Sequence, residues 1–262
     1  DNIVKTMADI KPDLIPIQNK QTACSDCSIR RLALFHGIPE NELSWTQKNR
    51  SCQYKLAARK EVYRETHHSD FMFTIYHGWL AIYKTLENGK RQILKIALPG
   101  DVIGYQANME AAMNYSAISL TDAILCAFSR SDMPELFRTN KHITKRLTEL
   151  NSRDMNLCQN RLLTIGQHTA IEKIAHFCAE LFYRVKTIYN EPEDDHINFP
   201  LSQEDIGDAT GLTKIHVNRT LKQLREKGLM EISSRTLKIH DIDELCKLGS
   251  FDKSTIHTYI LY

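Results

Sequence analysis

The sequence predicts an α+β protein in which a β-rich N-terminal half precedes a helical C-terminal half. Short β-forming runs separated by turn residues dominate from about residue 54 to residue 128. A helical period of apolar residues takes over from about Ser131 onward. The length of 262 residues, with 42% hydrophobic and 25% charged residues, fits about two globular domains with a sizeable core.

Closely spaced short strands predict a small antiparallel barrel or roll in the N-terminal half. Asn88–Gly89 between two apolar runs is a strong hairpin signal, and Gly78 and Pro99–Asp101 mark further turns. Strands this short, with turns between them, are typical of a closed antiparallel β architecture. The expected strands include Phe71–Tyr76, Leu80–Tyr83 and Ile93–Ile96.

One long amphipathic helix is predicted after the β-rich half. Its apolar stripe consists of Leu147, Met155, Cys158, Leu162 and Ile165. These positions recur at spacings of three, four or a multiple of four, with charged residues between them. Two interpretations are open, because the helix can pack on its own barrel or pair with a second copy in a coiled-coil-like dimer. A second helix is expected at Ala170–Val185, followed by a loop at Asn190–Asp195.

The segment from Leu201 to Leu229 has the pattern of two helices joined by a tight turn. Ser202, with Asp205 three residues later, can cap the start of the first helix much as a capping box does. Gly211 supplies the turn, and Thr213 is the expected N-cap of the second helix. In that second helix an inner apolar face is expected from Val217, Leu221 and Leu224.

The second helix is basic on its other faces. Five residues from Lys214 to Lys227 are Lys or Arg, against only Glu226. A positively charged helix fits the DNA major groove, where its N-terminal residues reach base edges and the others neutralise phosphates. Met230–Ile239, with its turn at Ser233–Ser234, adds the small hairpin of a wing. The alternative is a solvated basic helix pair that binds no nucleic acid.

The chain from about Cys24 to Leu248 resembles the Crp/Fnr family of bacterial transcription regulators. Beyond the helix-turn-helix, the specific matches are Gly78–Trp79, Gly89–Ile93 and Leu98–Gly104. The resemblance implies a jelly-roll β-roll like a cyclic-nucleotide-binding domain as the sensor, a long dimerisation helix and a C-terminal winged helix-turn-helix. It also implies a homodimer that binds a near-palindromic duplex operator, with RNA polymerase as a further partner.

The sequence patterns and the family resemblance divide the chain into five expected parts. They are a flexible leader at residues 1–23, the β-roll sensor domain at 24–138, the dimerisation helix at 139–166, the winged helix-turn-helix at 167–250 and a C-terminal tail at 251–262. The resemblance also favours the dimer interpretation of the long helix.

The base-contacting pattern departs from the better-known family members. Members that recognise a TGA-type half-site have Glu near the start of the recognition helix, where this sequence has Ile215. Arg219 matches the family's guanine-contacting arginine, and His216 and Asn218 are further candidates for base contacts. The other basic residues of the helix are expected to contact phosphate. The expected DNA-binding residues are Ser202, Thr213, Lys214, His216, Asn218, Arg219, Lys222 and Arg225.

A cyclic nucleotide is not the expected effector. Family members that bind one have a Gly-Glu pair for the ribose and an Arg-Ser pair for the cyclic phosphate. The equivalent stretches here are Ile103–Gln106 and Asn114–Ala117, which contain neither the carboxylate nor the arginine. A phosphate without a guanidinium partner loses charge-assisted hydrogen bonds.

The cysteines suggest a different signal. Cys24 and Cys27 form a Cys-x-x-Cys pair before the barrel, and oxygen-sensing Fnr proteins place cluster ligands there and at the position of Cys126. A [4Fe-4S] cluster usually takes four thiolates, but residues 29–35 lack the third N-terminal cysteine that the resemblance predicts. Cys52 is the expected replacement, which gives the ligand set Cys24, Cys27, Cys52 and Cys126. A zinc site, a thiol switch or a buried structural Cys126 are the alternatives.

Other function classes receive less support. No apolar run approaches the roughly 18 residues of a membrane span, and residues 1–20 lack an apolar signal core, so we expect a cytoplasmic protein without a membrane segment. His67–His68 could ligate haem or a metal, but adjacent residues of an extended segment point in opposite directions. No nucleophile, phosphate loop or acid/base pair stands out, so an enzyme is not expected.

Two function classes follow from the sequence. The first is a homodimeric, sequence-specific DNA-binding regulator that responds to oxygen or redox state through the iron-sulfur cluster, or that acts as a thiol switch or without a cofactor. The second is a redox or metal-binding protein whose helix-turn-helix mediates only protein contacts. Steep weakening of duplex binding with increasing salt distinguishes the first class.

Overall fold

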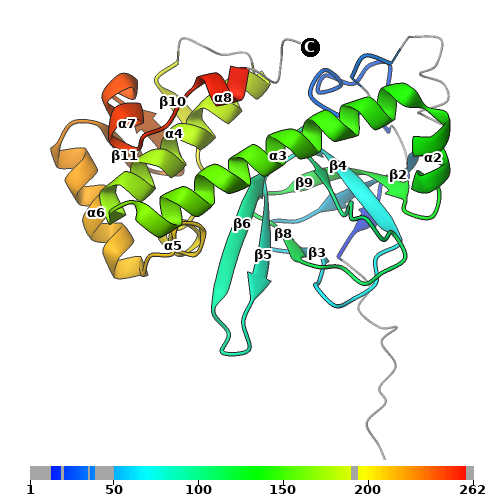
Figure 1. Ribbon diagram of the computed structural model, residues 1–262, viewed down its shortest axis with the longest axis horizontal. Helices are drawn as coiled ribbons and strands as arrows, with labels where there is room; N and C mark the ends of the chain where they lie inside the picture. Colours follow the sequence, from blue (N-terminus) through cyan, green and yellow to red (C-terminus); the bar gives the residue numbers. More distant parts are fainter. Residues whose placement is uncertain (1–12, 19–20, 35, 39–49, 190–193, 258–262) are drawn as a thin grey trace, which may run out of the picture. The chain divides into compact units, whose positions relative to one another are not determined.

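A computed structural model describes residues 13–18, 21–34, 36–38, 50–189 and 194–257. The chain divides into two compact units, which are described separately below. The first comprises residues 1–84 and 96–147, and the second comprises residues 85–95 and 148–262. Strands dominate the N-terminal part and helices the C-terminal part, as predicted (Figure 1). The division assigns residues 85–95, the tip of one hairpin, to the C-terminal unit.

The N-terminal unit is built on two antiparallel sheets. One has the strand order β1-β2-β9-β4-β7, and the other has the order β3-β8-β5-β6. The expected strands are present, with the Asn88–Gly89 turn between β5 and β6. The strands are β1 (Ile15–Pro16), β2 (Arg50–Leu56), β3 (Glu61–Tyr63), β4 (Phe71–His77), β5 (Leu80–Thr85), β6 (Arg91–Ala97), β7 (Val102–Ile103), β8 (Ser116–Ser119) and β9 (Ala123–Ser129).

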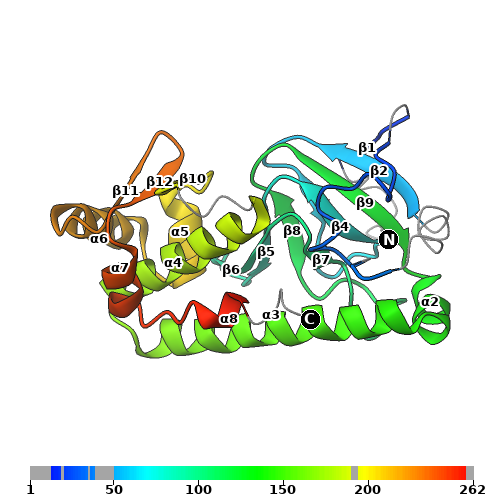
Figure 2. The same cartoon turned by 90° about the horizontal axis from the view of Figure 1, so that it is seen from above.

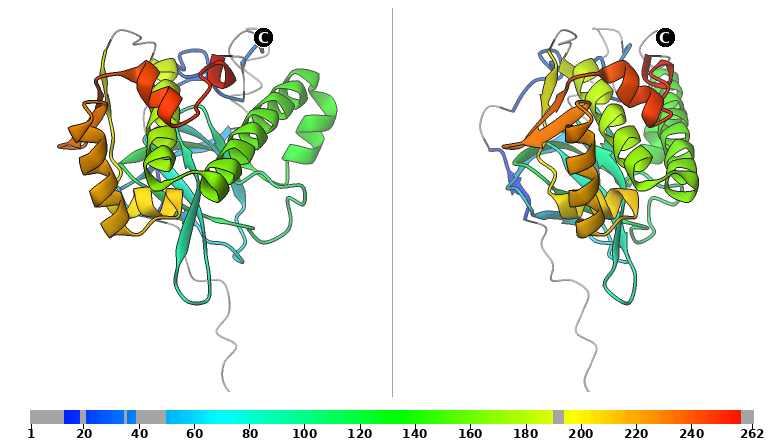
Figure 3. Two further views of the ribbon diagram at one scale, coloured as in Figure 1. Left: turned by 60° about the vertical axis from the view of Figure 1, so that its left-hand side comes forward. Right: turned by 90° about the vertical axis from the view of Figure 1, so that its left-hand side faces the viewer.

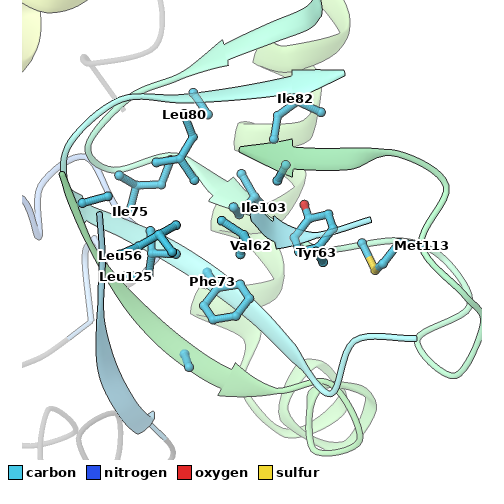
Figure 4. Close-up of a cluster of buried hydrophobic side chains, with 14 residues drawn as sticks. Leu56, Val62, Tyr63, Phe73, Ile75, Leu80, Ile82, Ile103, Met113 and Leu125 are labelled. Carbon is cyan, nitrogen blue, oxygen red and sulfur yellow. The ribbon is translucent and has the colours of Figure 1, made fainter. Parts of the chain in front are cut away.

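The alternation of side chains along β9 divides the inside of the roll from its outside. Ala123, Leu125 and Ala127 belong to the buried core cluster, in which Phe73 and Ile75 also lie (Figure 4). Because successive side chains of a strand point to opposite faces, Cys126 and Phe128 lie on the other face of the sheet. That outer face of β2, β9 and β4 is where the N-terminal segment packs.

Part of the expected leader is structured. Ile15 and Pro16 form β1, which pairs with Lys55 and Tyr54 of β2. Ile17 N donates to Gln53 O at 2.8 Å and continues this pairing. The leader expected at residues 1–23 therefore includes an edge strand, and residues 1–12 and 19–20 lie outside the described residues.

Three helices follow the roll. They are α2 (Met133–Thr139), α3 (Lys141–Gln167) and α4 (Ala170–Tyr189). The expected dimerisation helix, residues 139–166, corresponds to α3, which begins two residues later because Asn140 has an extended backbone and ends α2. Most of the loop expected at Asn190–Asp195 lies outside the described residues.

The C-terminal unit contains the helix-turn-helix and its wing. Figure 2 shows the wing hairpin next to β10, a three-residue strand that the sequence pattern did not reveal. The hairpin turn lies at Ser234–Arg235, one residue later than expected, because both residues have positive φ, at 49° and 61°, as in a tight hairpin turn. The elements are β10 (His196–Asn198), α5 (Gln203–Thr210), α6 (Lys214–Glu226), β11 (Met230–Ser233), β12 (Thr236–Ile239), α7 (Ile242–Leu248) and α8 (Ser254–His257).

A buried ion cluster joins α3 to α4 in this unit. Glu180 is 1% exposed, and its carboxylate accepts from Arg161 Nη2 at 2.9 Å and from Arg184 Nη1 at 3.2 Å. Burial by itself raises the pKa of Glu180, but the two guanidinium groups outweigh it and hold the pKa at about 2. Arg161 Nη1 also donates to Leu94 O at 2.8 Å, so the same cluster holds β6.

Replacing Glu180 by Gln should destabilise the protein by roughly 3–5 kcal/mol at pH 7, because two arginines stay buried without their carboxylate. The folded-state pKa of Glu180, about 2, lies below its ordinary value of 4.5. The contribution of the cluster is therefore complete above about pH 4.5 and is lost as the pH falls towards 2. Urea unfolding of both proteins between pH 7 and pH 3 measures the effect, and the difference should narrow at the acidic end.

The matched control is Glu204→Gln, which changes an exposed carboxylate on α5. It should alter the free energy of unfolding by less than about 1 kcal/mol. Equal losses in the two variants would contradict the assigned role of the cluster.

Candidate functional site

The first helix of the helix-turn-helix begins as the sequence predicts. Ser202 Oγ accepts from Asp205 N at 3.1 Å, and Asp205 Oδ2 accepts from Ser202 N at 2.9 Å, so both halves of a capping box are present. Gly211 ends α5 with a left-handed backbone, φ 70°. Thr213 then caps α6, with Thr213 Oγ1 accepting from His216 N at 3.3 Å. The angle between the helices is thus set by local residues.

The turn between α5 and α6 requires a second glycine. A Cβ at Gly207 would lie 2.5 Å from Leu212 O, a distance that no side chain tolerates. Leu212 N donates to Gly207 O at 3.0 Å across the same close approach. The sequence analysis did not single out Gly207, because a lone glycine within a helix is a weak signal.

One face of α6 is buried and the others are exposed. Val217, Thr220 and Leu224 form the inner face, while Leu221, expected there, is only half-buried. Figure 3 shows α6 in orange at the edge of the C-terminal unit, with one side turned away from α4 and α5. All of the expected DNA-binding residues have exposed side chains: Ser202, Thr213, Lys214, His216, Asn218, Arg219, Lys222 and Arg225.

The exposed side chains of α6 make few contacts within the protein. Asn218 Nδ2 donates to Gln203 Oε1 at 3.4 Å, and Lys222 Nζ lies 3.7 Å from Glu226 Oε1. His216 Nδ1 lies 3.1 Å from the capping hydroxyl of Thr213. Exposed contacts of this kind contribute little free energy, so a ligand can replace them at low cost.

An arginine from the hairpin between β5 and β6 contacts the first helix. Arg91 Nη2 donates to Asp205 Oδ1 at 3.1 Å, and Arg91 Nε donates to Asp208 Oδ2 at 2.7 Å. Gln92 Nε2 donates to Asp208 O at 2.6 Å. Asp205 is only 1% exposed, so one buried carboxylate both caps α5 and pairs with Arg91. The sequence analysis missed this contact, because its partners are 114 residues apart.

A second candidate site is a thiol cavity on the outer face of β2, β9 and β4. It has a volume of about 30 Å³, enough for water molecules. Cys24, Cys27 and Cys126 all line it, so the structure brings together three of the four expected ligands. None of the seven cysteines, all of which are described, forms a disulfide. The other lining residues are Thr22, Ile29, Arg30, Ala33, Arg50, Gln53, Thr74, Tyr76 and Phe128.

Two buried residues of β2 hold the cysteine-bearing segment against the sheet. Gln53 Oε1 accepts from Thr22 N at 2.8 Å, and Gln53 Nε2 donates to Cys126 Sγ at 3.3 Å. Arg50 Nη1 donates to Thr22 O at 2.6 Å. Among the described residues, Arg50 Nε and Thr74 Oγ1 are buried polar atoms without a hydrogen-bond partner. Both residues line the cavity, which therefore has unused hydrogen-bonding capacity.

Cys52 lies apart from the other three thiols. Gln53 is paired with Cys126 across β2 and β9, so these two side chains share the outer face of the sheet. Cys52 precedes Gln53 on the strand, does not line the cavity, and accepts at its Sγ from Gln21 Nε2 at 3.5 Å. Within the described residues, no group of three or more His, Cys, Asp or Glu side chains is arranged to hold a metal ion.

Burial affects two of the cavity thiols. It raises the pKa of the Cys27 thiol above its ordinary value of 9.0, and it does the same for Cys126 despite the Gln53 amide, which acts in the other direction. Both thiols are therefore protonated at neutral pH, and protonated thiols are poor nucleophiles.

Internal contacts fill the region around the stretch expected, from the family resemblance, to correspond to a cyclic-nucleotide site. Gln106 Nε2 donates to the carbonyls of Asn108, Ala111 and Ala112 at 3.0–3.1 Å. Arg130, which is 2% exposed, donates to Ser69 O at 3.0 Å and also to the carbonyls of Asn108 and Ala111. Two buried polar side chains thus hold residues 108–112 against the roll.

The expected dimer stripe on α3 separates into a buried and an exposed part. Leu147 is 6% exposed and packs within its own protomer, which corrects its assignment to a dimer face. Met155 and Leu162 are 58% and 67% exposed, Cys158 is also exposed, and Ile165 is half-buried. Leu163, which is 58% exposed, was not among the predicted positions.

No helix among the described residues is long and apolar enough to cross a membrane.

Comparison with protein-family models identifies both halves of the chain. Residues 54–140 match the cyclic nucleotide-binding domain, and residues 172–248 match the Crp-like helix-turn-helix domain.

Several curated relatives and solved structures cover most of the chain. The nitrogen fixation regulation protein FixK of Bradyrhizobium diazoefficiens is 28% identical, over 85% of this chain and 92% of the relative. FixK of Rhizobium meliloti is 31% identical, over 69% of this chain and 79% of the relative. The structure of FixK2 from Bradyrhizobium japonicum shares the fold, with a TM-score of 0.65 and 23% identity over 75% of this chain and 96% of that one. The chain therefore belongs to the Crp/Fnr family of transcription regulators, which have a helix-turn-helix DNA-binding domain.

Proposed function

We propose that this chain is a homodimeric, cytoplasmic transcription regulator that binds a specific near-palindromic DNA site and responds to oxygen or redox state. The observation that supports the DNA-binding part best is the geometry of α6. Its inner face is packed, its first turn is capped by Thr213, and its outer face presents Lys214, Arg219, Lys222 and Arg225 to solvent. A rigid helix with this charge fits the major groove of duplex DNA.

The outer residues of α6 divide into two roles. Arg219, Asn218 and His216 have the chemistry to contact base edges, since arginine can form two hydrogen bonds with guanine and asparagine can do so with adenine. The phosphate contacts are assigned to Lys214, Lys222 and Arg225. The two capped helix starts, at Ser202 and Thr213, approach the sugar-phosphate backbone of the DNA.

Arg219→Ala should reduce discrimination against one wrong base in each half-site by about 1–3 kcal/mol. The expected cause is the loss of two hydrogen bonds to a guanine edge. Fluorescence anisotropy with the preferred duplex and single-base variants, titrated over a range of salt concentrations, measures both specificity and salt dependence.

Lys222→Ala is the matched control, because it removes a charge from the same exposed face. It should weaken binding to all duplexes alike and reduce the salt slope by about 1. If Arg219→Ala also lowered specific and non-specific affinity equally, its assigned base contact would be wrong.

The exposed stripe of α3 supports a dimer of two identical chains. Met155, Cys158, Leu162 and Ile165 are spaced by three, four and three residues, as in the a and d positions of a coiled coil. Met155, Cys158 and Leu162 are exposed in a single chain, and they leave an apolar surface that a second copy can bury. Two recognition helices then bind two half-sites about one turn of DNA apart.

Leu162→Glu should convert the dimer to a monomer, because it places two buried carboxylates at the centre of the apolar stripe. Sedimentation equilibrium measures the mass, and the same variant should lose most of its affinity for a two-half-site duplex. Leu162→Met keeps an apolar side chain and should remain dimeric. A Leu162→Glu variant that sediments as a dimer would place the interface elsewhere.

The thiol cavity is the proposed site of redox sensing. The proposed redox-active groups are the thiols of Cys24, Cys27 and Cys126. The support is that these thiols line one cavity, which also contains polar atoms without a hydrogen-bond partner. A [4Fe-4S] cluster on Cys24, Cys27, Cys52 and Cys126 does not fit this arrangement, because Cys52 does not line the cavity that the other three cysteines line. The chemistry proposed for the three cavity thiols is reversible oxidation, with oxygen as the oxidant.

Cys126→Ser should abolish the change in DNA affinity between protein purified without oxygen and protein exposed to air. The matched control is Cys52→Ser, on the paired strand but outside the cavity, which should keep the response. Iron, zinc and sulfide content, with the visible spectrum, are measured on the same samples. About four irons per chain, lost in Cys52→Ser, would contradict the three-thiol site and support the four-cysteine cluster.

A cyclic nucleotide is not part of this proposal, although residues 54–140 match the cyclic nucleotide-binding domain. Two buried polar side chains, Gln106 of that stretch and Arg130, donate to backbone carbonyls of the protein itself. A ligand would have to break these bonds, which are expensive to lose in a buried site.

A further inference from the structure

The first turn of α6 exposes a large apolar side chain among polar neighbours. Ile215 is the second residue of the helix, and its side chain is 80% exposed. Among the large apolar residues that the described part of the chain leaves exposed, none has a higher exposed fraction. The neighbouring exposed residues Lys214, His216 and Asn218 are all polar. An isolated apolar group of this kind gains free energy when a partner buries it.

The helix places Ile215 on the same face as the base-contacting candidates. Residues three and four apart are neighbours on a helix surface, so Ile215 lies next to Asn218 and Arg219. The opposite face packs against the unit through Val217 and Leu224, and the Thr213 cap fixes the first turn. The backbone at Ile215 is therefore fixed at the end of the helix that reaches furthest into a groove.

The positive charges around Ile215 indicate that the partner is a polyanion. The apolar side chain of Ile215 indicates that it contacts an apolar group of that polyanion. Lys214, Arg219 and Lys222 are exposed on the same helix. In the major groove of DNA the only apolar group on a base edge is the C5-methyl group of thymine. We propose that Ile215 contacts the methyl group of one thymine in each half-site and is a specificity-determining residue of this protein. The inference rests on the proposed DNA-binding function and adds a recognised base to it.

Replacing single thymines by uracil tests the contact, because uracil lacks only the methyl group. The probe is the duplex that the wild-type protein selects from random sequences, with each thymine of one half-site replaced in turn. Wild-type protein should lose about fourfold in affinity at one thymine position, as expected for one buried carbon, and much less at the others.

Ile215→Ala should weaken binding to the all-thymine duplex by at least this factor, because it removes three carbons, and it should bind the thymine and uracil duplexes equally at that position. Because the side chain is exposed, the variant should unfold at the same temperature as the wild type. The control is Lys222→Ala, which should bind both duplexes more weakly and keep the full difference between them.

The outcomes separate this inference from the proposed function. Specific binding without any thymine position at which uracil matters would overturn the methyl contact and leave the DNA-binding function intact. An Ile215→Ala variant that keeps the wild-type difference between thymine and uracil would also overturn it. A wild-type protein that selects no sequence would contradict the proposed function and this inference together.

Discussion

The buried carboxylate of Asp205 is the interaction on which the geometry of the DNA-binding unit depends. One oxygen accepts from the backbone and side chain of Ser202 and so fixes the start of α5, and the other pairs with Arg91. A charge that is 1% exposed is stable only while it keeps such partners. The same group therefore sets the local structure of the helix-turn-helix and holds it to the hairpin between β5 and β6. The position of α6 follows, because the Gly207 and Gly211 turn joins it closely to α5.

A comparable arrangement connects the thiol cavity to α3 within the N-terminal unit. Arg146 of α3 donates to Leu32 O at 3.2 Å and to Ala33 O at 3.3 Å, a few residues after Cys24 and Cys27. Arg50 and Gln53 hold the other end of the same segment through Thr22. A chemical change at the thiols thus acts on a segment whose backbone carbonyls accept hydrogen bonds from Arg146 of the long helix. This provides a physical route from the proposed sensing site to the helix that carries the proposed dimer face.

The parts of the structure that the sequence predicted are those determined by neighbouring residues. The Ser202 capping box, the Gly211 turn and the basic face of α6 depend on residues a few positions apart, and the structure confirms each of them. The pairing of Arg91 with Asp205 could not be predicted, because nothing local relates residues so distant in the chain.

The thiol site and the dimer stripe also depend on contacts that the sequence alone does not reveal. The sequence position of Cys52 makes it the expected fourth ligand, but Cys52 does not line the cavity that contains the other three thiols. Leu147 has the helical spacing of a dimer position, yet the packing of its own protomer buries it. Periodicity defines a face of α3 without saying whether the same chain or a second copy covers it.

The most direct test of the central claim is selection of binding sites from random duplex DNA by the wild-type protein at near-physiological salt. The account predicts enrichment of an inverted repeat whose half-sites lie about 10 base pairs apart, centre to centre. A library that stays random after repeated rounds, or that enriches a single unrepeated site, would contradict a symmetric dimer that recognises DNA through α6.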